Sequence, residues 1–327
     1  MNNRIQYIDR LKGLAILLVV IGHLMAFCTG GEYNPIYEII CSFHMPLFMF
    51  LSGIVIAHTP PLKDINYLGK KAARFMLPMI CLGLLFTFTG GKDLSSFIAD
   101  RYKNGYWYLY VLTIFYVVMY VYSKLPSVKH RWVLDIAYLV VWQIAFMVAD
   151  RLLGEKMSDM SDISMCKGYW VYFFLGYMTR RHKWVEWLSE HNWAFTLALV
   201  SYVPLLYSYE TGLVVRFGQV LPLTAIIILV FLFRLREHET SRVEQSLSTI
   251  GRSTLDIYVL HYFVLRIIDL TDASSYLHQS SNYLLEFIML VAMALVVSGV
   301  CITVGKVLRQ SDIIRRVVFG EFQHLRG

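Results

Sequence analysis

The 327-residue chain is 57% hydrophobic and only 16% charged, with a formal net charge of +7. A soluble domain carries about a quarter charged residues, so this composition excludes an ordinary soluble globular protein. It predicts an all-α polytopic membrane protein, because a helix satisfies its own backbone hydrogen bonds inside a bilayer.

About ten apolar segments fit transmembrane helices in one bundle. Several are shorter than the roughly 20 residues that cross a bilayer unaided, and those at 168–179 and 193–209 are the weakest, which leaves nine or eleven spans open. In chain order the predicted spans are 11–28, 36–57, 75–90, 105–123, 132–150, 168–179, 193–209, 217–233, 253–269 and 283–308. No linker or clear repeat divides the chain, so we predict one membrane-embedded domain over 1–327, of which 309–327 form a short basic cytoplasmic tail.

The 30 Lys and Arg residues indicate an orientation. With the N-terminus inside, every predicted cytoplasmic segment carries at least three of them, as the rule that basic residues stay inside requires. Both termini are then cytoplasmic. The basic balance is explained by topology, and no nucleic-acid partner is indicated.

Five cysteines are dispersed through mostly apolar segments, which indicates small buried side chains and neither a disulfide framework nor a metal site. They are Cys28, Cys41, Cys81, Cys166 and Cys301.

The first span places Lys12 and His23 eleven residues apart, on one helix face and about 16 Å apart along the axis. An ionisable group inside a bilayer is costly and usually faces a cavity or a partner. A packing histidine bonded to a neighbouring carbonyl explains the spacing equally well. Asp9 lies three residues before Lys12, where an ion pair would orient Lys12, but it is too far along the helix to orient His23. A partner for His23 must come from another helix, which the sequence does not identify.

Four later segments add candidate residues. Pro46 should bend the second span near His44 and free polar groups that could line a cavity. His44 and Ser52 are candidate cavity-lining residues, and ordinary packing explains them equally well. Lys71 and Arg74 share a helical face and suit phosphates, although topology or lipid headgroups explain the pair as well.

Trp107 begins the fourth span, where an aromatic belt would also lie. Ser253 and Asp256 open the ninth span, where we expect a variant capping box. Tyr258 and His261 follow, and His261 is the weaker candidate for a cavity wall.

Together these segments resemble the acyltransferase-3 superfamily of membrane acyltransferases, and most of all its fucose-4-O-acetylase-related branch. The resemblance covers about residues 4–308. It is carried by Asp9…Lys12-Gly13…His23, Phe43-His44-Met45-Pro46…Ser52-Gly53, Lys71…Arg74…Pro78, Trp107-Tyr108-Leu109 and Ser253…Ile257-Tyr258…His261.

The resemblance implies an O-acetyltransferase of the bacterial cytoplasmic (inner) membrane. Such an enzyme takes acetyl groups from cytoplasmic acetyl-CoA, with no metal, and places them on hydroxyls of a cell-surface or lipid-linked glycan. The family's basic residue and histidine, which are separated by ten intervening residues, fall on Lys12 and His23, and its basic pair falls on Lys71 and Arg74. Lys stands at both first positions where many members have Arg, so a bidentate contact would be lost there.

The expected roles follow from this resemblance. His23 acts as general base on the acceptor hydroxyl, with an acetyl-His intermediate left open. Asp9 orients Lys12. The expected donor-phosphate residues are Lys12, Lys71, Arg74 and Arg10, and the expected cavity-lining residues are His44, Ser52, Trp107, Tyr258 and His261.

Two rival interpretations remain. A transporter or flippase of a lipid-linked sugar or small anion would use the same buried histidines and basic residues. A non-catalytic scaffold leaves Lys12 and His23 unexplained. Dependence on acetyl-CoA separates the enzyme from the transporter. The acceptor, the acyl chain length, the side of transfer and the oligomeric state are left open.

Overall fold

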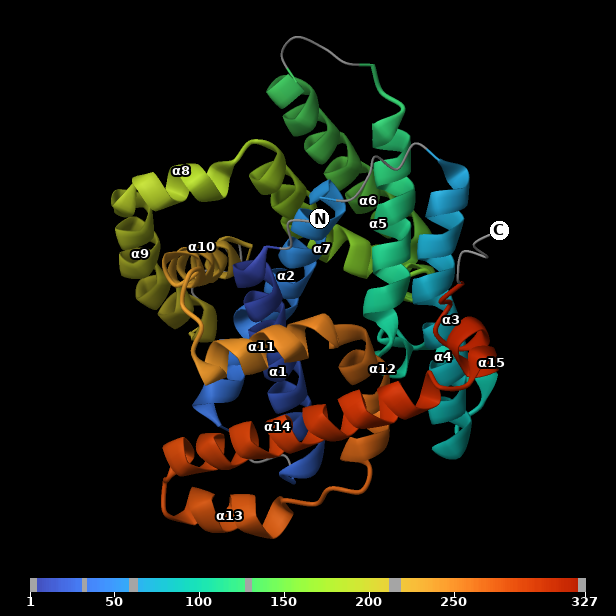
Figure 1. Ribbon diagram of the computed structural model, residues 1–327, viewed down its shortest axis with the longest axis vertical. Helices are drawn as coiled ribbons and strands as arrows, with labels where there is room; N and C mark the ends of the chain where they lie inside the picture. Colours follow the sequence, from blue (N-terminus) through green and yellow to red (C-terminus); the bar gives the residue numbers. More distant parts are fainter. Residues whose placement is uncertain (1–4, 31–33, 59–63, 127–130, 212–218, 323–327) are drawn as a thin grey trace. The chain divides into compact units, whose positions relative to one another are not determined.

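The computed structural model describes residues 5–30, 34–58, 64–126, 131–211 and 219–322, and every regular element among them is a helix (Figure 1). The all-α class is therefore confirmed. Each of the ten predicted segments coincides with a helix: α1 (Gln6–Cys28), α2 (Pro35–His58), α3 (Ile65–Thr89), α5 (Trp107–Ser123), α6 (Arg131–Met160), α7 (Ile163–Arg181), α9 (Asn192–Glu210), α10 (Val220–Leu235), α12 (Thr254–Leu265) and α14 (Tyr283–Leu308).

Six shorter helices were not predicted, because they are brief or polar and give no apolar run. They are α4 (Leu94–Ala99), the 3-10 helix η1 (Lys103–Gly105), α8 (Trp184–Glu190), α11 (Arg242–Arg252), α13 (Thr271–Gln279) and α15 (Asp312–Val317). The last of these lies in the segment expected as a tail, of which 323–327 fall outside the described residues.

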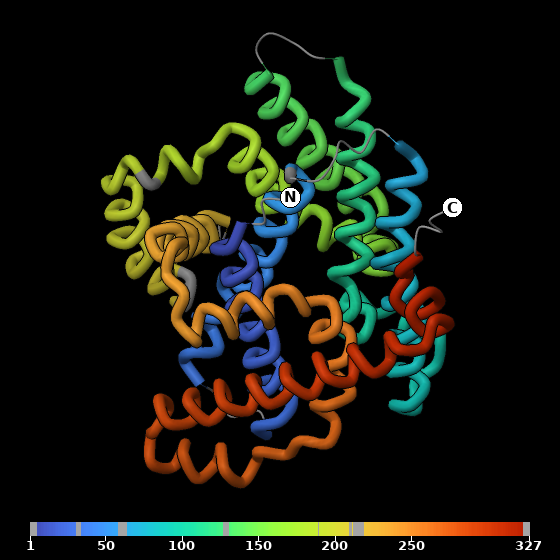
Figure 2. The backbone as a smooth tube through the Cα atoms, in the orientation of Figure 1, coloured from blue at the N-terminus to red at the C-terminus, as the bar shows by residue number. Residues whose placement is uncertain are grey.

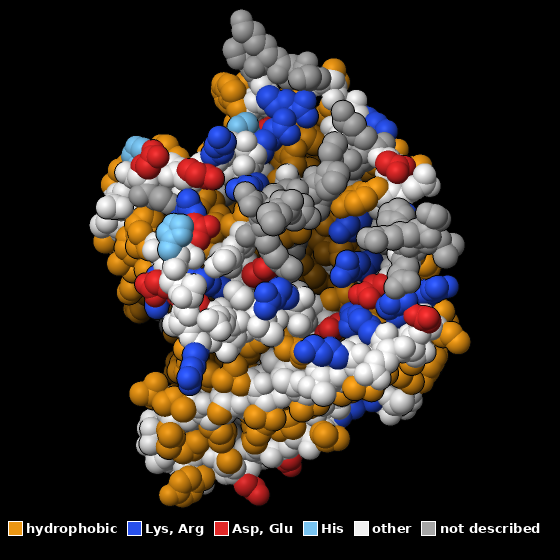
Figure 3. Space-filling model, viewed as in Figure 1, with side chains coloured by type: hydrophobic (Ala, Val, Ile, Leu, Met, Phe, Trp, Pro, Cys, Tyr) orange, Lys and Arg blue, Asp and Glu red, His pale blue; other side chains and the backbone are white. Residues whose placement is uncertain are grey.

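Among the described residues, five helices are long and apolar enough to cross a membrane: α1, α2, α3, α6 and α14. Three more, α5, α10 and α12, are apolar but shorter. On α14, large apolar side chains such as Ile288 and Val296 are exposed, and Figure 3 shows hydrophobic side chains along this helix in the lower part of the view. Exposed apolar surface of this extent suits contact with lipid. The chain is an integral membrane protein, while the count of ten spans and their orientation stay predictions.

The chain divides into two compact units, each described here by itself. Unit 1 comprises Met1–Ser52 and Thr179–Thr303, and unit 2 comprises Gly53–Met178 and Val304–Gly327.

Unit 1 is organised by a close crossing of α1 and α11. A Cβ on Gly13 would lie 2.1 Å from the Leu247 carbonyl oxygen, and one on Gly251 would lie 1.7 Å from that of Asp9. The two backbones are thus in direct contact, as occurs where small residues let membrane helices approach closely. The crossing holds α11 against the first turns of α1, and α12, which follows it, packs on α1 as well.

The opposite end of α1 is held as well. The Leu270 backbone N–H donates to the Cys28 carbonyl over 2.8 Å. The buried Glu286 carboxylate of α14 accepts hydrogen bonds from Asn34 at 2.7 Å and from Ser274 of α13 at 2.5 Å. This carboxylate explains why α13 and α14 lie side by side (Figure 2).

One helix start differs from its prediction. Ser253 precedes α12 but makes no side-chain cap, so the variant capping box expected there is wrong. A full capping box lies at α11 instead, where Ser241 and Glu244 bond reciprocally to each other's backbone N–H at 3.3 and 3.0 Å. The short polar helix takes the cap because its first turn is outside the apolar segment, where orphan N–H groups need a side-chain partner.

Unit 2 has an aromatic core between α5 and α7. The Phe115 ring lies 5.0 Å from Phe173 and 5.4 Å from Trp170, measured between ring centroids. A Cβ on Gly53 would lie 1.8 Å from the Phe173 carbonyl oxygen, so this glycine permits α2 to touch α7. A buried ion pair of 3.3 Å between Lys103 and Asp162 fixes the loop before α5.

Gly251→Ala is expected to destabilise the protein by about 1–3 kcal/mol or more, because a methyl group overlaps the Asp9 carbonyl and must separate α11 from α1. Gly299→Ala on α14 is the matched control, since nothing lies within 4 Å of its added Cβ. Thermal unfolding of the purified protein in detergent measures both. Equal midpoints for the two variants would contradict the crossing.

Candidate functional site

His23, the central residue of the sequence prediction, has a side-chain partner on another helix. The Tyr262 hydroxyl of α12 lies 2.9 Å from His23 Nε2, and the two ring centroids are 4.9 Å apart. The exposed Phe27, one turn further along α1, also stacks on the imidazole, at a centroid distance of 5.6 Å. His23 is half-buried, so its ring is held by aromatic neighbours yet stays accessible.

His261 stands beside this pair and is fully buried. Its ring stacks on His23 at a centroid distance of 5.3 Å. Its Nδ1 lies 2.9 and 2.8 Å from the carbonyl oxygens of Ile257 and Tyr258. Carbonyls only accept hydrogen bonds, so Nδ1 carries the proton and Nε2 is left as an acceptor. Among the described residues this Nε2 has no hydrogen-bond partner.

His44 of α2 is held in the same tautomer. Its Nδ1 lies 2.8 Å from the Ile40 carbonyl oxygen. A Cβ on Gly22 would lie 4.0 Å from the Ile40 side chain, so the α1 turn that carries His23 packs near this part of α2. The helix continues through Pro46 to His58 without a break.

His23 differs from the other two histidines. His44 and His261 each use Nδ1 for a backbone carbonyl of their own helix. Within the part of the chain that the structure describes, His23 Nδ1 has no such bond, and its one hydrogen bond is that of Nε2 to Tyr262. His23 therefore differs in which nitrogen is left: its Nδ1 is open, whereas His44 and His261 keep Nε2, and its hydrogen bond goes to a side chain of another helix.

Tyr262 meets His23 because α12, which follows α11 after a turn at Ser253, also packs on α1. Sequence reasoning missed Tyr262, and no local pattern in the sequence points to it.

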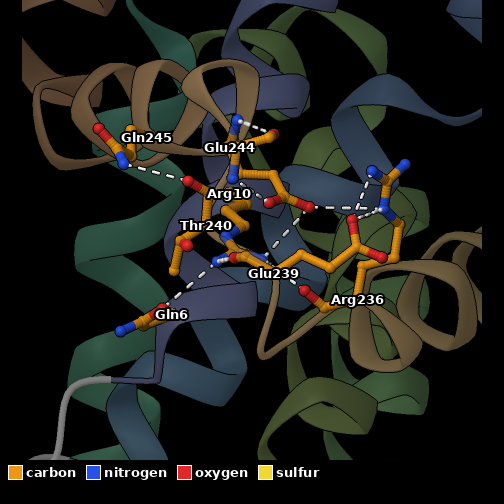
Figure 4. A network of polar contacts seen from close by, with 8 residues as sticks. Gln6, Arg10, Arg236, Glu239, Thr240, Glu244 and Gln245 are labelled. Carbon is orange, nitrogen blue, oxygen red and sulfur yellow. Dashed lines mark hydrogen bonds and ion pairs between the residues drawn. The ribbon is translucent and has the colours of Figure 1, made fainter.

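Arg10 is enclosed by internal partners (Figure 4). It is 3% exposed, and its guanidinium donates to the carbonyl oxygens of Arg236 at 2.6 Å and Glu239 at 2.5 Å. It also lies 3.6 Å from the Glu244 carboxylate. This arrangement fastens the loop before α11 to α1, so Arg10 is already used inside unit 1.

The Glu244 carboxyl belongs to the same network. Burial acts to raise its pKa, but the Ser241 backbone N–H, Arg10 and Arg236 outweigh burial and leave the pKa below its usual value. The carboxylate is thus charged when it meets Arg10. Lys12 is half-buried and Asp9 buried next to the crossing, and their expected roles stay predictions.

In unit 2 the predicted basic pair lines a cavity of about 430 Å³. Lys71 lies over the Tyr67 ring, 5.5 Å from its centroid, and Arg74 lies 3.9 Å from the Glu321 carboxylate. The lining residues are Asp64, Tyr67, Lys70, Lys71, Arg74, Gly320, Glu321 and Phe322. Three cations around one cavity suit an anionic ligand.

The remaining predicted residues are mostly in the interior. The Ser52 hydroxyl donates to the Phe48 carbonyl at 3.0 Å. Trp107 is buried and stacks on Tyr169 at 4.9 Å, which places it inside unit 2 and not in an exposed aromatic belt. Tyr258 is buried with its ring 6.2 Å from that of His261, so it belongs to the histidine cluster of unit 1.

Comparison with known proteins gives one family. A family model described as an acyltransferase domain matches residues 5–303. Two curated proteins, both called nodulation protein NolL, are similar over part of their length. The one from Sinorhizobium fredii is 26% identical over 155 residues, which are 43% of this chain and 42% of the relative. The one from Mesorhizobium japonicum is 28% identical over 156 residues, 43% of this chain and 41% of the relative. No solved structure matches.

Tyr262→Phe is expected to slow acyl transfer about two- to tenfold, because a hydrogen bond of roughly 0.5–1.5 kcal/mol that orients His23 is lost. The control is Tyr276→Phe, since Tyr276 is 74% exposed on α13. Steady-state transfer rates of both purified variants test this assignment. A wild-type rate for Tyr262→Phe would show that Tyr262 does not orient His23 for the reaction.

Proposed function

The chain belongs to the acyltransferase-3 family, and we propose that it is a membrane-bound O-acetyltransferase of the bacterial inner membrane. It moves an acetyl group from cytoplasmic acetyl-CoA to a hydroxyl of a cell-surface or lipid-linked glycan. The donor and the acceptor rest on the resemblance of the motifs. The chemistry rests on the availability of one nitrogen of His23.

His23 is the proposed general base. In the tautomer whose Nε2–H donates to the Tyr262 hydroxyl, Nδ1 carries a lone pair for the acceptor hydroxyl. As that hydroxyl oxygen attacks the thioester carbonyl, its proton passes to Nδ1, and the C–S bond breaks to release the CoA thiolate, which takes up a proton. Tyr262 keeps its hydrogen bond to the imidazolium that forms. A positioned base of this kind contributes roughly 10² to 10⁴-fold in rate.

Lys71 and Arg74 are the proposed contacts to the donor's phosphates, and the role expected for Lys12 of unit 1 stays a prediction from the motif. The support for Lys71 and Arg74 is the cavity of about 430 Å³, in which Lys70 adds another positive charge. Lysine binds phosphate as a point charge, while arginine adds a planar fork of donors. Arg10 has a different role in this proposal, because its guanidinium already holds the loop before α11.

Contacts within the units support the proposed topology. The backbone of Gly320 packs on Ala73 and Arg74, which supports placing the start of α3 and the segment around Gly320 on the same side of the membrane. If α1 and α2 each cross once, the N-terminus is on that side too. The density of Lys and Arg there supports a cytoplasmic assignment.

His23→Ala is expected to abolish acetyl-CoA turnover, a loss of at least about 100-fold, because the base is removed. His238→Ala, at an exposed loop position, is the matched histidine control and should retain wild-type turnover. Free thiol release by purified protein with crude glycan measures the rate, and membrane levels of each variant report folding.

The transporter interpretation makes the opposite prediction. An exporter has no reason to bind CoA or to release thiol, so the absence of any acetyl-CoA turnover in the wild-type protein would overturn the proposed enzyme and favour the transporter.

A further inference from the structure

The last described segment of the chain packs against the start of α3 in unit 2. Phe319 is fully buried, and the Arg309 guanidinium lies 3.9 Å from its ring centroid. Gly320 has a φ of +60°, and a Cβ there would lie 2.6 Å from the Ala73 carbonyl oxygen. The segment is thus anchored by its aromatic ring and by a glycine backbone that touches α3.

This anchoring places Glu321 between two arginines. Its Oε1 accepts a hydrogen bond from Arg309 Nε at 3.1 Å and lies 3.9 Å from Arg74 Nη2. Its backbone N–H donates to the Arg315 carbonyl at 3.1 Å, which fixes the direction of the side chain. A carboxylate in this position is an anion inside the cavity that Lys70, Lys71 and Arg74 line.

A carboxylate and a phosphate oxygen make the same kind of contact with a guanidinium, and the phosphate carries more charge and more acceptor atoms. Resting on the donor proposed above, we propose that Glu321 is a built-in anion of the donor site, which holds the place between Arg74 and Arg309 that a phosphate of the donor's nucleotide end takes. Binding the donor then displaces Glu321, and Arg309 becomes a further phosphate contact. Arg309 and Glu321 lie beyond residue 303, where the match to the family model ends.

The proposal fixes the sign of a charge effect. Glu321 competes with the donor for Arg74, so removing its charge tightens donor binding. Exposed ion pairs are worth about 0.2–1 kcal/mol, which corresponds to an effect of up to about fivefold. The Arg74 side chain is about half exposed, which keeps the effect in this modest range.

The test is equilibrium binding of adenosine 3′,5′-bisphosphate to the purified full-length protein in detergent. Glu321→Gln should lower the Kd about two- to fivefold. Glu321→Asp keeps the charge and should bind as the wild type does. Asp64→Asn is the matched control, because it removes one negative charge from the same cavity and asparagine still caps α3.

A double-mutant cycle of Glu321→Gln with Arg74→Gln distinguishes charge masking from a purely structural role of Glu321. The gain from Glu321→Gln should shrink in the Arg74→Gln background, because the charge that Glu321 masks is then absent. Raised salt should shrink it too. Unchanged or weaker nucleotide binding by Glu321→Gln, or an equal gain from Asp64→Asn, overturns the proposal.

Acetyl-CoA turnover in the same preparations keeps this proposal apart from the enzyme assignment. If the wild type turns over acetyl-CoA but Glu321→Gln does not change nucleotide binding, only the proposed role of Glu321 is wrong. If no variant binds the nucleotide and no turnover is detected, both the role of Glu321 and the enzyme assignment are wrong.

Discussion

The site in unit 1 depends on direct backbone contact between α1 and α11. Gly13 and Gly251 have no side chains, so the Leu247 and Asp9 carbonyls can occupy the space where a Cβ would be. Helix α12 follows α11 after a turn at Ser253 and also packs on α1, where its Tyr262 hydroxyl meets His23. Arg10 then secures the loop that leads into α11.

Basic side chains have different environments in the two units. In unit 1 Arg10 and Glu244 are buried together, each with further hydrogen bonds, which is the condition under which a buried ion pair is tolerated. In unit 2 Arg74 and Lys70 are exposed at a cavity, where a strongly charged ligand can reach them. The same residue type thus holds structure where it is enclosed and is available for binding where it is not. This contrast separates Arg10 from the residues proposed to hold phosphate.

Sequence patterns predicted the long helices well, because an apolar run is a local property and a bilayer demands such runs. They also singled out His23, because an ionisable side chain inside a membrane is energetically costly and usually has a function or a partner. They did not predict α11, which is short and polar, nor the two carbonyl partners of Arg10, which lie 226 and 229 residues away. Tyr262 was missed for the same reason: its link to His23 spans 239 residues and depends on the packing of α12 on α1, which no local pattern encodes. Glu321 lies at the end of the chain, where only tertiary packing reveals its contact with Arg74.

The most direct test of His23 as the base is chemical rescue. Single-turnover transfer from labelled acetyl-CoA to glycan would be followed in purified His23→Ala protein with and without added imidazole. The account predicts little transfer without imidazole and a rate that rises with its concentration, because a free base then replaces the missing side chain. Transfer at the wild-type rate without imidazole would contradict the central role of His23.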